Sequence, residues 1–157
     1  MIGFAELRQI LPHRYPVLLV DRVDELVVGE RLVARKAVTG NEPWYADLSD
    51  DAGPDQVAYP EVLVLESWCQ AAGVLVNAGR PAVLGGSVML LGGVSDIFFP
   101  RRVLPGDVLV HRVRVLRDRG DTMVLAGDAL VDGDPVLSVG TVTTALRPAD
   151  HLRARHT

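Results

Sequence analysis

The stretch from Tyr59 to Asn77 constrains the fold more than any other, because it is typical of a helix that is apolar on nearly every side. Pro60 suits the first turn of this helix, and Gly79 and Pro81 suit its end. A helix that is apolar all round is buried, either in a membrane or in a fold that wraps it. Its apolar residues are Val62, Leu63, Val64, Leu65, Trp68, Cys69, Ala71, Ala72, Val74, Leu75 and Val76.

Two polar residues interrupt this apolar surface. Glu66 and Gln70 are four residues apart and therefore share one face of the helix. A carboxylate in apolar surroundings is costly unless it is paired, hydrogen-bonded or used in chemistry. The alternative is a Glu–Gln pair that reaches solvent at the edge of the helix.

Composition predicts one ordinary globular domain that spans residues 1–157. Hydrophobic residues make up 48% of the chain and charged residues 23%, as in soluble domains. The net charge of −4 argues against a nucleic-acid partner, and no basic run indicates a membrane surface.

Cysteine usage and hydropathy narrow the class further. Cys69 is the single cysteine, which excludes an internal disulfide and a CxxC metal site, and we expect it to act as a small buried hydrophobe. The first residues lack the features of a signal peptide, and no apolar run reaches the ~18 residues of a membrane span. We expect a cytoplasmic protein without cofactor or metal.

The N-terminal part predicts a short helix followed by a hairpin. Apolar spacing indicates a helix over 4–10, and a turn bracketed by prolines follows at 11–16. Runs rich in β-formers predict strands at 17–23 and 31–39, joined by a turn at 28–30.

The segment 40–59 is irregular and long, and loops of this length are usually functional or disordered. It contains the carboxylates Asp47, Asp50, Asp51 and Asp55. We interpret residues 44–59 as an inserted loop whose acidic cluster is solvated.

Strands are predicted again after the long helix, and the tail 148–157 is expected to fray. A glycine-rich strand at 86–99, expected to be kinked or bulged, is followed by strands at 108–116, 122–131 and 135–146. This order favours an α+β fold in which an antiparallel sheet curls around one long central helix. Exposed strand edges commonly meet a partner, so we expect a dimer.

Several motifs, in order along nearly the whole chain, resemble the hot-dog-fold 3-hydroxyacyl-[acyl carrier protein] dehydratases of the FabZ type. The matching segments are Leu11-Pro12-His13-Arg14-Tyr15-Pro16, Leu18-Leu19-Val20-Asp21-Arg22-Val23, Asn41-Glu42-Pro43 before Trp44 and Tyr45, Pro60 to Glu66 with Gln70-Ala71-Ala72-Gly73, Pro105-Gly106-Asp107 and Ala145-Leu146-Arg147. The resemblance implies a hot-dog fold, a dimer, an acyl substrate held by an acyl carrier protein, and a catalytic role for Glu66.

One departure from the family pattern concerns the catalytic base. Family members carry a G-H-F-P-G-x-P-x-M-P-G segment before the helix, and its histidine is the base. The corresponding residues 46–61 contain no histidine, and Glu61 replaces the final glycine. Of the four histidines, His13 matches the opening motif, His111 falls within a strand, and His151 and His156 lie in the tail.

The resemblance assigns chemistry to the helix. Dehydration of a 3-hydroxyacyl thioester requires a base at C2, an acid at the C3 hydroxyl and a donor to the enolate-like oxygen. Glu66 matches the family's acidic residue, and Gln70 is expected to bond Glu66 or to hold the departing water. The free N–H groups at Glu61 and Val62 suit the thioester oxygen.

Three hypotheses follow from the missing histidine. In the first, the chain is one subunit of a heterodimeric dehydratase, and Glu66 serves a histidine of the partner. In the second, a homodimeric dehydratase or related enzyme recruits a loop aspartate as base, or Tyr59 as donor. In the third, the chain binds an acyl thioester without catalysis.

Further site residues are expected at the mouth of an acyl tunnel. Arg101 and Arg102, next to Phe98 and Phe99, form the best basic patch for an acidic carrier protein, and two solvated arginines are the alternative. Trp68 either lines the tunnel or belongs to the core, which we favour. The resemblance implies that the protein acts in fatty acid or polyketide biosynthesis.

Overall fold

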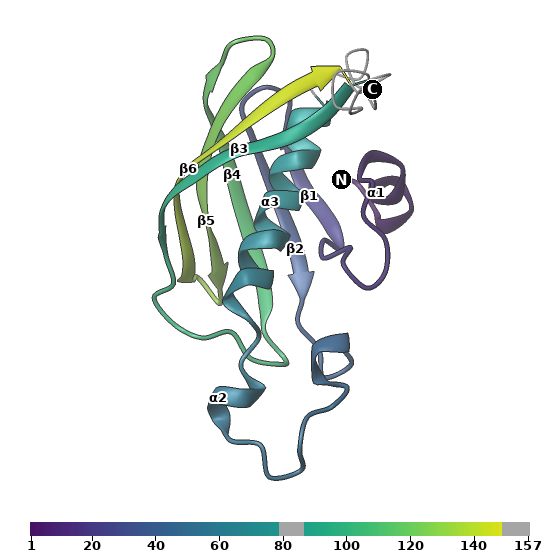
Figure 1. The fold of residues 1–157 in the computed structure, drawn as a ribbon, viewed down its shortest axis with the longest axis vertical. Coiled ribbons are helices and arrows are strands. Elements are labelled where there is room, and N and C mark those ends of the chain that lie inside the picture. Colours follow the sequence, from purple (N-terminus) through teal and green to yellow (C-terminus); the bar gives the residue numbers. More distant parts are fainter. Residues whose placement is uncertain (79–86, 149–157) are drawn as a thin grey trace, which may run out of the picture.

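The computed structural model describes residues 1–78 and 87–148, and a curved antiparallel sheet holds one long helix within this part (Figure 1). The predicted ends at Gly79 and Pro81, and the tail 149–157, lie outside the described residues. The helices are α1 (Phe4–Ile10), α2 (Pro54–Val57) and α3 (Glu61–Ala78), with a 3-10 turn at Pro43–Tyr45. The strands are β1 (Arg22–Val27), β2 (Arg31–Ala37), β3 (Ser87–Phe98), β4 (Val108–Asp118), β5 (Thr122–Val131) and β6 (Asp134–Pro148).

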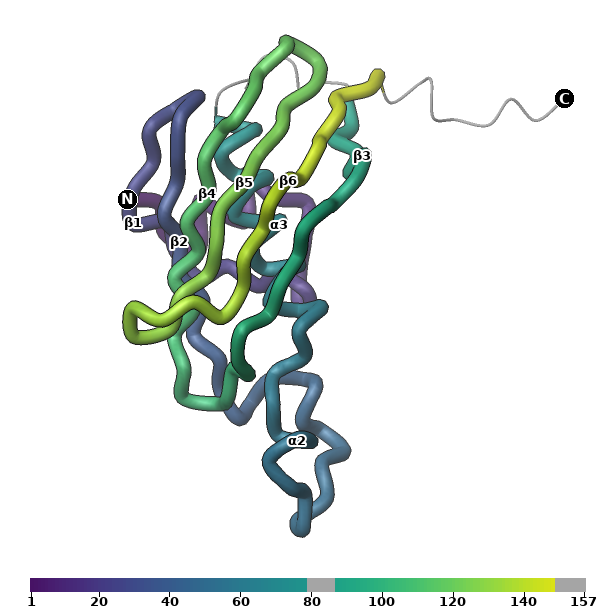
Figure 2. The backbone as a smooth tube through the Cα atoms, turned by 90° about the vertical axis from the view of Figure 1, so that its left-hand side faces the viewer, coloured from purple at the N-terminus to yellow at the C-terminus, as the bar shows by residue number. Residues whose placement is uncertain are grey.

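The six described strands form one sheet in the order β1-β2-β4-β5-β6-β3, and every pair is antiparallel. The sheet curls around α3, which packs on β2, β4 and β5 (Figures 1 and 2). This confirms the predicted α+β architecture. None of the described helices is long and apolar enough to cross a membrane.

Burial of α3 is one-sided within this chain. Trp68, Val74 and Leu75 are fully buried against the sheet, whereas Val62 is 68% exposed and Cys69 only partly buried. The sequence predicted a helix wrapped on all sides. The remaining apolar surface of α3 is therefore left for something outside the described chain to cover.

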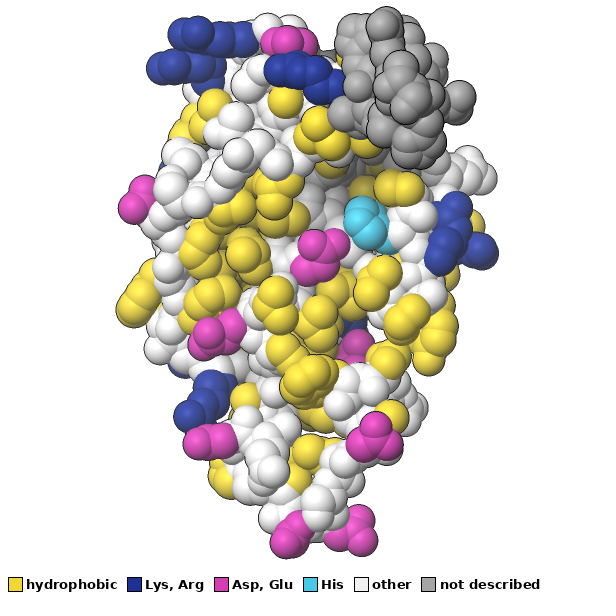
Figure 3. Space-filling view, viewed as in Figure 1, with side chains coloured by type: hydrophobic (Ala, Val, Ile, Leu, Met, Phe, Trp, Pro, Cys, Tyr) yellow, Lys and Arg dark blue, Asp and Glu magenta, His cyan; other side chains and the backbone are white. Residues whose placement is uncertain are grey.

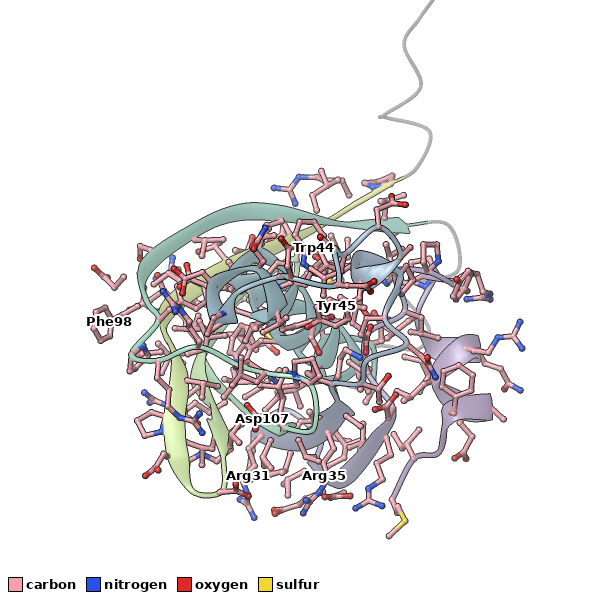
Figure 4. The ribbon with its side chains drawn as sticks, turned by 90° about the horizontal axis from the view of Figure 1, so that it is seen from below. Arg31, Arg35, Trp44, Tyr45, Phe98 and Asp107 are labelled. Atoms are coloured by element: carbon pink, nitrogen blue, oxygen red, sulfur yellow. The ribbon has the colours of Figure 1, made fainter. Side chains whose placement is uncertain are left out.

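The glycine-rich strand is bulged, as predicted. The pairing of β3 with β6 shifts register between Leu91 and Gly93, so Gly92 is the extra residue. Among the described strands β3 lies at the edge of the sheet, where β6 is its one neighbour. Leu91 and Phe98 are 60% and 65% exposed on it, and Figure 4 shows Phe98 pointing away from the body of the chain.

The predicted strand at 17–23 is wrong over its first part, because β1 begins only at Arg22. The Asp21 N–H already bonds to the Arg35 carbonyl of β2, but the backbone groups of Val17 and Leu19 bond to side chains of α3. Gln70 Nε2 donates to the Val17 carbonyl, and the Leu19 N–H donates to Gln70 Oε1. The β-forming composition of this run reflects burial against a helix.

The loop before α3 extends beyond the sheet and carries α2 (Figure 1). Its base is anchored by the buried pair of Lys36 Nζ and Glu42 Oε1 at 2.7 Å, and the Tyr45 hydroxyl donates to the Val57 carbonyl. Figure 4 looks onto this end, where Trp44 is 57% exposed. The acidic cluster is exposed, as expected; its members are Asp47, Asp50, Asp51 and Asp55.

A buried polar chain links α3 to the sheet. The Ser67 hydroxyl donates to the Leu19 carbonyl at 2.7 Å, so its single hydrogen is used. His111 Nε2, 2.8 Å from Ser67 Oγ, must therefore donate to it. His111 is fully buried, and its Nδ1 has no hydrogen-bond partner among the described residues. Burial, with a smaller contribution from the charge of Lys36, lowers the pKa of His111 to about 3.

Gly127 allows Trp68 to pack between α3 and the sheet. Trp68 Nε1 donates to the Arg112 carbonyl of β4 at 3.2 Å. A Cβ on Gly127 would lie 1.9 Å from that carbonyl oxygen and 3.2 Å from the Trp68 ring. Any side chain at 127 would force the two strands apart.

We therefore expect Gly127→Ala to lower the free energy of unfolding by about 3 kcal/mol, as an overpacked core does. Urea denaturation measures this change. Gly40→Ala is the matched control, because a Cβ there meets no atom within 4 Å. Equal stability of the two variants would contradict the close approach at Gly127.

The buried His111 predicts a loss of stability in mild acid. Its folded pKa of about 3 lies below the unfolded value of 6.5, so the unfolded state binds more protons between these pH values. Stability is then lost as pH falls from 6.5 towards 3. Between pH 7 and 5, the free energy of unfolding should fall about 2 kcal/mol more in the wild type than in His111→Gln. Parallel pH curves for the two proteins would show that His111 is not the cause.

Candidate active site

A cavity of about 600 Å³ opens along one face of α3. Its other walls are the N-terminal segment 8–14 and residues of β3 and β6. The α3 wall follows a stripe at helical spacing, with Glu66, Cys69, Gln70, Gly73 and Asn77 along it and Ala72 beside it. At ~1.5 Å per residue, this stripe is about 16 Å long, which suits an extended chain.

Small and apolar residues line the middle of the cavity. A Cβ on Gly73 would lie 3.2 Å from Met89 Cε and 3.5 Å from Leu11 Cδ2, so both side chains approach the helix at this point. Met89 and Leu11 therefore narrow the cavity between Glu66 and Asn77. Figure 3 shows the surrounding face as largely hydrophobic, with an acidic side chain beside a histidine.

Two side-chain nitrogens lie at one oxygen of Glu66, one as a hydrogen-bond donor and one at ion-pair distance. Gln70 Nε2 lies 2.8 Å from Glu66 Oε1, and His13 Nε2 lies 3.5 Å from the same oxygen. Oε2 has no hydrogen-bond partner among the described residues. The Glu66 side chain is 41% exposed, so one carboxylate oxygen is held while the other remains available in the cavity.

Gln70, which orients Glu66, is buried, with only 2% of its surface exposed. Its Oε1 accepts the Leu19 N–H at 2.8 Å, and its Nε2 donates to Val17 O at 2.7 Å as well as to Glu66. Both amide hydrogens are therefore used. Of the two roles predicted for Gln70, the structure contains the bond to Glu66.

His13 was missed as a site residue by sequence reasoning, which placed it only in the opening motif. The turn that carries it is fixed by Arg14 Nη1, which bonds the carbonyls of Leu11 and His13. Glu66 is 53 positions away, and no spacing in the sequence relates the two. The first clue is structural, because the bonds of Gln70 to Val17 and Leu19 bring this segment onto α3.

Cys69 lines the cavity but is not a nucleophile. Burial, with a smaller contribution from the charge of Glu66, raises the pKa of Cys69 to about 12. Its thiol therefore stays protonated at neutral pH, which disfavours a role as nucleophile.

Two predicted substrate-binding residues lie in the core rather than in the cavity. Trp68 is fully buried beneath the sheet, and Tyr59 is 2% exposed and pairs with Val103 through its backbone. The Tyr59 hydroxyl has no hydrogen-bond partner among the described residues, and burial raises the pKa of Tyr59. Lys36 Nζ lies 5.7 Å from the centre of its ring.

The remaining predicted residues lie at the surface near the start of α3 and the end of β3. Glu61, Val62 and Phe98 are exposed, and Phe99 packs partly against the core. Arg102 pairs with Asp55 of α2, and Arg101 donates to the Val131 carbonyl. None of these side chains lines the cavity.

Comparison with known proteins identifies the family. The model of the FabA-like domain matches residues 11–140. The chain is 38% identical to a 3-hydroxyacyl-[acyl-carrier-protein] dehydratase FabZ of Streptococcus mutans over 93% of this chain and 99% of that protein. The corresponding protein of Psychromonas ingrahamii is 43% identical, over 84% of this chain and 85% of that one.

A solved structure supports the fold. One chain of the dehydratase heterocomplex ApeI:P from Xenorhabdus doucetiae superposes with a TM-score of 0.76 and 18% identity, covering 93% of both chains. At this identity the likeness concerns the fold alone. With the family match over most of its length, the chain belongs to the FabA-like family of hot-dog 3-hydroxyacyl-[acyl-carrier-protein] dehydratases.

Proposed function

We propose that this protein removes water from a 3-hydroxyacyl group carried as a thioester on an acyl carrier protein, in fatty acid or polyketide synthesis. The names of its FabZ relatives support this reaction. The observation that carries the proposal is Glu66, with one oxygen held by Gln70 and the other available in an elongated apolar cavity.

In this proposal Glu66 acts as the acid. Its Oε2 protonates the C3 hydroxyl as the C3–O bond breaks, a base takes the C2 proton, and the C2–C3 double bond forms. The first turn of α3 leaves the N–H groups of Glu61 and Val62 without helical partners, and these suit the thioester oxygen. The acyl chain then follows the stripe from Glu66 towards Asn77.

For the base, we propose a histidine from a partner subunit, which makes the protein one half of a heterodimer. The loop that precedes α3 contains no histidine from Asn41 to Glu61. The exposed side of α3 and the unpaired edge of β3 offer surface for such a partner. The structural neighbour from Xenorhabdus doucetiae is itself described as a dehydratase heterocomplex.

A homodimer that uses a loop aspartate as base is the alternative. The loop carboxylates are exposed and lie outside the cavity of their own chain. They would have to reach the cavity of a second copy, and the extension of the loop beyond the sheet permits such a reach (Figure 1). If the protein only binds an acyl thioester, it would catalyse dehydration neither alone nor with a histidine-bearing partner.

Carrier-protein docking remains a proposal for Arg101 and Arg102. Both arginines are exposed near Phe98. Arg102 is partly neutralised by Asp55, so Arg101 contributes the freer positive charge.

We predict dehydration of a 3-hydroxyacyl carrier-protein substrate when this chain is mixed with a histidine-bearing homologue, and little with the chain alone. Glu66→Gln should lower kcat of the mixture by about 10²- to 10⁴-fold, because it removes the acid and keeps the size. Glu30→Gln, at an exposed turn, is the matched control. Absorbance of the enoyl thioester measures turnover.

Full activity of the chain alone would contradict the heterodimer. Asp-to-Asn variants in the loop would then be measured to find the base. Binding of acyl carrier protein without turnover in either condition would contradict the dehydratase itself and favour the binding protein.

Chain-length preference should depend on Met89. Met89→Ala removes the side chain that meets the helix at Gly73, so the cavity lengthens towards Asn77. Each additional buried methylene contributes about 0.8 kcal/mol, or roughly fourfold in kcat/KM. We expect the acyl-chain length with the highest kcat/KM to increase, measured with a series of substrates. Leu116→Ala, which changes an exposed side chain of β4, should leave this length unchanged. An unaltered profile would place the acyl chain elsewhere.

A further inference from the structure

We propose that His13 is a positioning residue for the reaction, and that it fixes Glu66 Oε2 as the oxygen that transfers the proton. This inference rests on the proposed dehydratase function. It differs from the role expected of a histidine in such a site, because His13 acts as a donor to Glu66 and not as the base.

The surroundings of the imidazole select its tautomer. His13 Nδ1 is buried and has no hydrogen-bond partner among the described residues, whereas Nε2 faces Glu66 Oε1 at 3.5 Å. A proton on Nδ1 would create a buried donor without an acceptor, which costs about 1–3 kcal/mol. It would also set the Nε2 lone pair against a carboxylate oxygen. The Nε2–H tautomer avoids both.

This tautomer prevents His13 from acting as the base through Nε2. A neutral imidazole accepts a proton only at its unprotonated nitrogen, which here is the buried Nδ1. Substrate in the cavity can reach Nε2 but not Nδ1, because only the Nε2 side lies at Glu66. The base must therefore come from another group, in agreement with the proposed partner.

The position of His13 is determined from both sides of its turn. Arg14 bonds the carbonyls of Leu11 and His13, and Gln70 bonds the backbone of Val17 and Leu19. The His13 side chain is 32% exposed, and its buried Nδ1 edge lies on the side away from solvent. These bonds fix the backbone from which the His13 side chain extends towards Glu66.

Two donors on one oxygen determine which oxygen reacts. Gln70 Nε2 and His13 Nε2 both face Glu66 Oε1, so turning the carboxylate plane away from this orientation would lose both contacts and leave no oxygen directed as Oε2 is now. Proton transfer to the C3 hydroxyl then proceeds from Oε2. Loss of one donor should loosen the carboxylate and lower kcat more than it raises KM.

Two variants separate a donor from a base. His13→Gln keeps an amide N–H near the position of Nε2 but cannot take up a proton, whereas His13→Ala has no donor. With the partner present, we expect His13→Ala to lower kcat by about 10- to 100-fold with little change in KM, and His13→Gln to recover most of it. Equal melting temperatures show that the fold is retained. An equal loss of kcat in both variants would identify His13 as the base. An unchanged kcat in His13→Ala would show that His13 does not position Glu66. Either result overturns the proposal.

A second measurement does not require turnover. ¹⁵N NMR of protein labelled at histidine reports which ring nitrogen of His13 carries the proton. We expect a protonated Nε2, an unprotonated Nδ1, and a shift of the Nε2 signal in Glu66→Gln. A protonated Nδ1 overturns the inference even if no dehydration is found, whereas the expected tautomer without turnover contradicts only the proposed function.

Discussion

The bonds of the Gln70 amide to the backbone of Val17 and Leu19 hold the site together. At these two residues, hydrogen bonds to Gln70 take the place of pairing with a strand, and they hold the N-terminal segment against α3. The same amide donates to Glu66, so one buried side chain connects the proposed catalytic carboxylate to the fold. Leaving the groups of this buried amide unsatisfied would cost about 1–3 kcal/mol, so the hydrogen-bonded arrangement is favoured over its loss. His13 and the cavity wall 8–14 depend on it.

The packing of α3 explains why the site lies where it does. Trp68 and Ser67 bond to Arg112 and His111 of β4 and fix the helix against the sheet. Glu66 precedes these two residues and lies on the side of α3 that the sheet leaves uncovered. A carboxylate on the covered side would lose its hydration without compensation. The open side contains the cavity and the exposed apolar residues, which under our proposal receive the acyl chain and a second subunit.

Much of this organisation could be predicted from the sequence. The long helix, the hairpins, the bulged β3 and the placement of Glu66 and Gln70 on one helix face follow from periodicity and motif order. The sequence also predicted a helix wrapped on all sides, whereas Val62 is 68% exposed. Two further features could not be predicted. The run before Arg22 has β composition, and periodicity cannot distinguish pairing with a strand from burial against a helix. The contact of His13 with Glu66 joins residues far apart in the chain, and it depends on the backbone bonds of Gln70.

The most direct test is a crystal structure of the protein, with its partner, bound to a 3-hydroxyacyl carrier-protein analogue that has an amide in place of the thioester. The account predicts the C3 hydroxyl oxygen at hydrogen-bond distance, about 2.6–3.2 Å, from Glu66 Oε2. It also predicts Oε1 still bonded to Gln70 and the acyl chain along Gly73. An analogue bound away from the α3 stripe, or a C3 hydroxyl beyond the reach of Glu66, would contradict it.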